Sequence, residues 1–91
     1  MADDVATMAR IIKRYSNRKL YDTEDSHYVT LGKVAELIRA GDELRVIENG
    51  TQRDITAATM ALIIYEEERR GSKLPVEGLR RIIRSGLPAG Q

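Results

Sequence analysis

The alternation of apolar and polar residues predicts short antiparallel strands in the first third of the chain. Apolar and cationic side chains alternate, though imperfectly, from Ile11 onward. Two hairpins compete in this region, since Ser and Asn favour a bend at Asn17 that would pair residues 10–21, and the polar loop 22–26 would pair residues 19–29. We expect the second hairpin, because its polar break is longer.

The next segment has the pattern of an amphipathic helix over residues 31–40. Its apolar residues recur at the i, i+3, i+4, i+7 spacing of one buried face. Thr30 is a suitable N-cap, because its hydroxyl can accept from a free amide of the first turn. Gly41 is a suitable C-terminal stop. We therefore expect the helix to end there.

A second hairpin and a second helix are predicted to follow. Residues 44–47 form a short apolar strand, and Asn49-Gly50 favours a tight turn because both residue types tolerate positive φ. Residues 52–55 would return as the partner strand. Thr56 would then cap a helix over residues 57–70, closed by Gly71.

A third helix is predicted over residues 76–85, with Pro75 suited to its first turn. It has an apolar stripe and a basic stripe, formed by Leu79, Ile82 and Ile83 and by Arg80, Arg81 and Arg84. The fold class is therefore α+β, in the order ββ-α-ββ-α with a further C-terminal helix, and antiparallel hairpins packed on the helices. The chain divides into a flexible lead (1–10), the domain proper (11–71) and a C-terminal helix with its tail (72–91).

The second predicted helix is apolar almost all round for two turns, which is typical of a buried helix. One face of a small sheet cannot cover it. We expect a second subunit to do so, in a homodimer or higher homo-oligomer, with Met60, Ile63 and Ile64 at the interface. The alternative is that the third helix folds back over it.

Composition narrows the class of protein. The chain has 91 residues, enough for one domain with a thin core, and it has no cysteine for disulfides or thiol-bound metal. No apolar run approaches the roughly 20 residues that span a bilayer. The acidic start lacks a signal-peptide core, so we expect a cytoplasmic protein without a membrane partner.

Positive charge is concentrated although the formal net charge is only +1. Residues 10–19 contain five cationic side chains and no carboxylate, with tyrosine and asparagine among them. Lys and Arg neutralise phosphates, and Asn and Arg can bond base edges, so this mixture suits nucleic acid. The alternative is an edge strand whose cations block unwanted pairing and whose tyrosines pack inward.

The sequence offers little for catalysis. His27 lies alone in a polar loop and is expected to be solvated, because a metal site needs several ligands in register. There is no Ser/His/Asp or Cys/His set and no Gly-rich phosphate loop. We therefore expect neither an enzyme, nor a cofactor, nor a metal.

The basic run and the residues after it resemble a known family, the N-terminal DNA-binding domain of the polyhydroxyalkanoate (PHB/PHA) synthesis repressor, PhaR. The matching residues are Lys13, Arg14, Tyr15, Asn17, Arg18, Lys19, Leu20, Tyr21, Asp22 and Thr23, followed by Tyr28-Val29-Thr30-Leu31, Val34-Ala35 and Asp54-Ile55-Thr56. The resemblance covers about residues 11–70. It implies a bacterial transcriptional regulator that acts on double-stranded DNA in the cytoplasm, at the nucleoid.

With this resemblance, we expect Lys13, Arg14, Arg18 and Lys19 to contact phosphates and Asn17 or Arg18 to reach a base edge. Tyr15 and Tyr21 are expected in the core or between strands, and Asp22 and Thr23 are expected to shape a turn. Arg80, Arg81 and Arg84 are a possible second phosphate contact or simply a solvated helix face.

Family members also bind the polyester granule through a separate C-terminal region. Only twenty residues follow Gly71 here, so we do not expect this chain to bind the granule. An alternative function is a non-enzymatic adaptor, in which the basic strand binds an acidic partner and the second helix mediates assembly.

Overall fold

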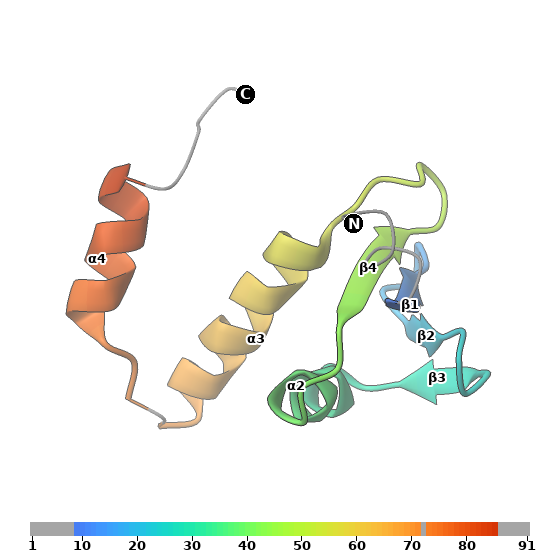
Figure 1. The fold of residues 1–91 in the computed structure, drawn as a ribbon, viewed down its shortest axis with the longest axis horizontal. Coiled ribbons are helices and arrows are strands. Elements are labelled where there is room, and N and C mark those ends of the chain that lie inside the picture. The colour runs from blue at the N-terminus through green and yellow to red at the C-terminus, as the bar shows by residue number, and fades with distance from the viewer. Residues whose placement is uncertain (1–8, 72, 86–91) are drawn as a thin grey trace.

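The computed structural model describes residues 9–71 and 73–85, and Figure 1 shows their arrangement. Most of the expected lead-in and the tail after Ser85 lie outside the described residues. The first strand, β1 (Arg10–Arg14), begins one residue before the expected start at Ile11. The fold class is α+β, as predicted from the sequence.

The sheet has four strands in the order β3-β2-β1-β4. Strands β2 (Leu20–Asp22) and β3 (His27–Val29) continue from β1 as an antiparallel meander. Both competing hairpins therefore form, with β2 shared between them. The basic run begins in β1, which is an interior strand of the sheet and not an edge strand.

The structure differs from the predicted second hairpin at the fourth strand, β4 (Leu44–Glu48). It pairs in parallel with β1 along its whole length, and residues 52–55 contribute only an isolated bridge between Ile47 and Asp54. Neither residue of the expected turn, Asn49-Gly50, has positive φ, whereas Gln52 does, at 62°. The chain thus leaves β4 through a wider loop.

Helix α2 (Leu31–Arg39) begins as predicted and ends one residue before the predicted Ala40, which is its C-cap. The Thr30 hydroxyl accepts from the Lys33 amide at 3.0 Å, which satisfies one free donor of the first turn. Gly41 follows the helix with a φ of 99°, a conformation that glycine adopts at little cost.

Helix α3 (Thr56–Arg69) differs from prediction at its start. Thr56 is its first residue and not its cap. The Thr56 hydroxyl donates to Asp54 Oδ1 at 2.6 Å and accepts from the Val46 amide at 2.8 Å. It therefore ties the helix to β4, and Gly71 closes the far end with a φ of 102°.

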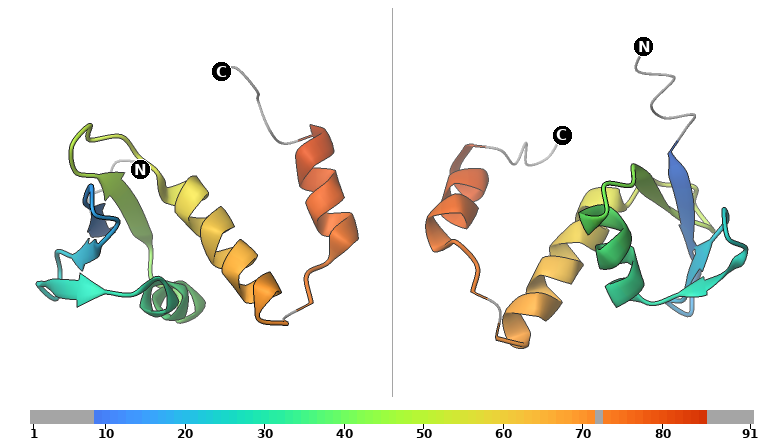
Figure 2. Two further views of the ribbon diagram at one scale, coloured as in Figure 1. Left: turned by 180° about the vertical axis from the view of Figure 1, so that it is seen from behind. Right: turned by 60° about the horizontal axis from the view of Figure 1, so that its bottom comes forward.

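Helices α2 and α3 cover one face of the sheet, as the two views of Figure 2 show. The core between them is small and aliphatic, consisting of Ile12, Leu20, Val34, Ala35, Leu44, Val46 and Ile63. The opposite face of the sheet is not covered by any helix that the structure describes.

Helix α4 (Val76–Ser85) has the predicted bounds but stands apart from the sheet, beyond α3 (Figures 1 and 2). Its Ile82 and Ile83 are 56% and 68% exposed. On α3, Ile64 and Tyr65 also remain exposed. The alternative in which the third helix folds over the second is therefore wrong.

Candidate nucleic-acid interface

The side chains of β1 alternate between the two faces of the sheet, as strand geometry requires. Ile12 is fully buried beneath the helices, and Arg10 and Arg14 lie on the same inner face. Ile11 and Lys13 lie on the uncovered outer face. Two of the five predicted nucleic-acid contacts, Lys13 and Arg14, thus start on opposite sides of the sheet.

Arg10, the first cation of the basic run, is held by acidic groups of the same molecule. Its guanidinium lies 2.7 Å from Asp22, 3.5 Å from Asp25 and 3.3 Å from Asp42. Burial opposes its charged form, but the charge and hydrogen bond of Asp22, with the charges of Glu24 and Asp42, outweigh that and raise the pKa of Arg10. Arg10 therefore stabilises the fold and is not available to an outside phosphate.

Asp22 shapes the following turn by local hydrogen bonds, as predicted, whereas Thr23 bonds instead to β1, twelve residues earlier in the chain. Asp22 Oδ1 accepts from the amides of Glu24 and Asp25 at 2.9 and 3.3 Å. The Thr23 hydroxyl donates to the Ile11 carbonyl at 2.7 Å. Asp22 therefore stabilises the β2–β3 turn, and Thr23 connects the start of that turn to β1.

The turn between β1 and β2 presents Arg18 at its tip. Asn17 Oδ1 accepts from the Lys19 amide at 3.0 Å, so its oxygen is used within the turn and only its NH₂ group remains free to donate outward. Arg18 has a φ of 66°, uncommon for a residue other than glycine. The Arg18 amide donates to the Tyr15 carbonyl at 2.8 Å, which closes the turn.

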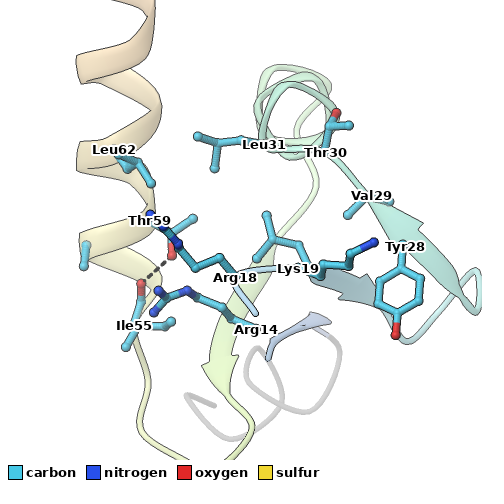
Figure 3. Close-up of a pocket in the computed structure, with 12 residues that line it drawn as sticks. Arg14, Arg18, Lys19, Tyr28, Val29, Thr30, Leu31, Ile55, Thr59 and Leu62 are labelled. Carbon is cyan, nitrogen blue, oxygen red and sulfur yellow. Dashed lines mark hydrogen bonds between the residues drawn. The ribbon is translucent and has the colours of Figure 1, made fainter. Parts of the chain in front are cut away.

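Three cations, Arg14, Arg18 and Lys19, line a cavity of about 750 Å³ between the sheet and the starts of α2 and α3 (Figure 3). Lys19 Nζ also lies 5.6 Å from the centre of the Tyr28 ring, within cation–π range. In Figure 3 the Arg14 and Arg18 side chains point toward α3, whereas Lys19 extends toward Tyr28.

These three cations and Lys13 form no ion pair with any carboxylate in the part of the chain that the structure describes. Other cations of the molecule, such as Arg39 with Glu67 and Arg45 with Asp54, do form such pairs. Uncompensated positive charge is therefore concentrated at the β1–β2 turn and around it.

The outer face of the sheet carries a second group that the sequence did not single out. Tyr21 and Tyr28 pack edge to face with ring centres 5.3 Å apart. Arg45 of β4 pairs in register with Ile11, on the same face as Lys13. The parallel pairing of β4 with β1 brings Arg45 there, and no local pattern in the sequence signals that pairing.

The predicted secondary cluster lies on the detached helix α4. Arg80 forms an ion pair with Glu77, whereas Arg81 and Arg84 are exposed and form none with the described residues. The distance of α4 from the sheet keeps this cluster separate from the first (Figure 1).

The residues predicted at a subunit interface divide into two groups. Ile63 is only 8% exposed and belongs to the core of the single chain. Met60 and Ile64 are 38% and 40% exposed, beside the buried stripe of α3 that contains Ile63. Only the latter pair is free to contact a partner.

Two further properties bear on the class of protein. Among residues 9–71 and 73–85, no group of three His, Asp or Glu side chains is placed to hold a metal ion. No helix in this same part of the chain has the length and apolar character needed to cross a membrane.

Residues 11–71 match the family model described as the PHB/PHA accumulation regulator DNA-binding domain. The chain belongs to this family. The match spans the sheet, α2 and α3, and ends just before α4. The accumulation-regulator domain therefore contains both the free cations of the β1–β2 turn and the cavity that they line.

Two curated relatives match the same region of this accumulation-regulator chain. An uncharacterised protein of Allochromatium vinosum is 46% identical over 65 residues, which are 71% of this chain and 42% of the relative. An "uncharacterized protein in phbA 5'region" of Thiocystis violacea is 43% identical over 65 residues, 71% of this chain and 47% of the relative. The chain thus spans less than half of each relative. No solved structure matches it.

Proposed function

We propose that the chain binds double-stranded DNA through the free cations at and beside the β1–β2 turn, as a transcriptional regulator. The family is one of DNA-binding regulator domains, which supports the general function. The observation that supports this surface is that Arg14, Arg18 and Lys19 line one cavity and form no ion pair with any carboxylate of the described residues. Phosphate groups of DNA would supply the missing negative charge.

The roles within this surface follow from geometry. Arg18 stands at the tip of the turn with its side chain directed toward Thr59 across the cavity, and its fork of donors can contact a phosphate or a guanine edge. The free NH₂ of Asn17 would donate beside it. Lys13 lies on the other face of the sheet, so it would reach the duplex only if the edge of the sheet enters a groove.

We further propose that the chain represses genes of PHB/PHA accumulation in the bacterial cytoplasm, at the nucleoid. The family description supports this, and the Thiocystis violacea relative is named for its position in the phbA 5' region. Homodimerisation through the exposed side of α3 would present two β1–β2 turns, as a palindromic operator requires.

The test is the salt dependence of binding to duplex DNA. A triple variant, Arg14→Gln, Arg18→Gln and Lys19→Gln, should bind more weakly than the native chain, and its log–log salt slope should be shallower by up to about three. The control replaces Lys33, Arg70 and Lys73 by Gln, which removes the same charge far from the turn.

Fluorescence anisotropy over a range of salt concentrations measures both quantities. Equal weakening in the two triple variants would show that only overall charge matters and would refute this surface. A flat salt response of the native chain would refute phosphate contact altogether.

A further inference from the structure

The cavity beside the β1–β2 turn has a shape and chemistry that DNA contact does not explain. Its volume of about 750 Å³ lies within the range of small-molecule sites. Its walls come from the end of β3, the start of α2 and the first turns of α3. The apolar side chains that line it are Leu20, Val29, Leu31, Ile55, Ala58 and Leu62.

The uncharged and the charged polar groups of the cavity lining come from different elements. The Thr59 hydroxyl donates to the Ile55 carbonyl at 2.8 Å, and the Thr30 hydroxyl accepts from the Lys33 amide, so both are used within their helices. The charged groups of the lining are Arg14, Arg18 and Lys19, all from β1 and the turn (Figure 3). No carboxylate lines the cavity. It thus has apolar walls and a positively charged rim, in which Arg14 and Arg18 point toward α3 and Lys19 points toward Tyr28.

A DNA backbone could satisfy the rim but not the walls, because phosphates and sugars would leave the apolar side chains without cover. Leu62 is 48% exposed on the wall. No residue of helix α4 lines the cavity. A hydrocarbon chain would cover the apolar walls, and one anionic head group would pair with the cations of the rim.

We propose that this cavity binds a single-chain anionic amphiphile, with its head group on Arg14 and Arg18 and its chain against Leu31, Ile55 and Leu62. The head is a carboxylate or a phosphate, since both fit a pair of Arg donors. Each methylene buried against the walls strengthens binding about fourfold.

A regulatory consequence follows, and it rests on the proposed function. Arg14 and Arg18 would also contact DNA, so the amphiphile and the duplex compete for them. The ligand would then release the regulator from its operator. Ligand binding itself does not depend on DNA and is measured separately.

The first experiment is calorimetric titration of the full chain with octanoate, octyl phosphate, octanol and butyrate, all below their micellar concentrations. Octanoate or octyl phosphate should bind at least about tenfold more tightly than octanol, which lacks the charge, and than butyrate, which lacks the chain. The tighter of the two anions identifies the head group. Equal binding of octanol and octanoate, or no binding of either anion, would overturn the proposal.

Matched variants locate the site. Leu62→Glu places a carboxylate on the cavity wall at an exposed helical position and should weaken octanoate binding at least about tenfold. Ala61→Glu adds the same charge to the adjacent exposed position, outside the lining, and should leave binding unchanged. Equal effects of the two variants would refute this cavity as the site. Loss of self-association in Leu62→Glu alone, without ligand binding by the native chain, would assign the cavity to a second copy instead.

The second experiment adds octanoate to the complex with duplex DNA. Displacement from the native chain, but not from Leu62→Glu, supports competition. If octanoate binds and DNA is not displaced, the regulatory link fails and the cavity stands. If the native chain does not bind DNA at all, the proposed function fails, and the calorimetric result still decides the cavity.

Discussion

Asp22 is the charged side chain on which the local structure of the N-terminal region depends most. It is 1% exposed, and its two oxygens are divided between the Arg10 guanidinium and the amides of the following turn. A carboxylate this deeply buried is tolerated because it is fully hydrogen-bonded and paired. Because Asp22 holds Arg10 in an ion pair, Arg10 is not free to bind a ligand. Only the rest of the basic run can do so.

Replacing Asp22 by Asn should destabilise the fold by about 2–3 kcal/mol, because it leaves the half-buried Arg10 without its closest partner. Urea denaturation followed by circular dichroism measures the change. The control is Asp25→Asn, whose carboxylate is 51% exposed and 3.5 Å from Arg10, and which should cost less than about 0.5 kcal/mol. Similar losses in both variants would show that Asp22 has no special structural role.

Asp54 should make stability depend on acid pH. The Thr56 hydroxyl and amide donate to its carboxylate and lower the pKa of Asp54. Its stabilisation is therefore complete above the ordinary aspartate pKa of about 3.9 and is lost as the pH falls through the lower folded-state value. Melting temperatures measured across this acidic range should fall less steeply in Asp54→Asn than in the native chain. Parallel curves would contradict this.

Sequence reasoning at the residue scale succeeded where the interactions are local and failed where they are distant. The turn role of Asp22 follows from bonds to neighbours in the chain. The capture of Arg10 could not be foreseen, because its carboxylate partners come from segments as distant as Asp42. The same applies to Arg45, which reaches the outer face only through the pairing of β4 with β1.

At the scale of the element, the helices were predicted well and the second hairpin was not. Helical periodicity and terminal glycines are properties of a continuous segment, so α2 and α4 were found with nearly correct bounds. The choice of partner for β4 depends on the rest of the sheet. Here the five-residue register with β1 prevails over the local turn preference of Asn49-Gly50.

Thr56 joins β4 to α3, so replacing it should weaken the packing of both elements. In Thr56→Val the Val46 amide loses its acceptor inside the core and Asp54 loses a donor, so we expect a loss of about 1–3 kcal/mol. Thr51→Val removes an exposed turn hydroxyl and serves as the control. Denaturant unfolding distinguishes them, and equal stabilities of the two variants would refute this role.

At the scale of the whole molecule, α3 presents an exposed apolar side that a single chain does not cover. Ile64→Glu should convert a dimer to a monomer, because a carboxylate would be buried in the proposed interface without a partner. Ile82→Glu makes the same change on α4 and should leave the dimer intact. Light scattering coupled to size exclusion measures the mass. A native chain that is already monomeric would refute dimerisation, and dissociation by Ile82→Glu alone would move the interface to α4.

Strands β1 and β4 are parallel neighbours in the sheet, but β2, β3 and α2 separate them in the sequence. During synthesis, the first three strands therefore leave the ribosome before the strand that completes one side of β1. Until residues 44–48 emerge, that side has unpaired backbone groups that could recruit another nascent chain. Lysine and arginine side chains on this temporarily unpaired strand repel a second, like-charged nascent chain. The same cations would therefore reduce aggregation during synthesis.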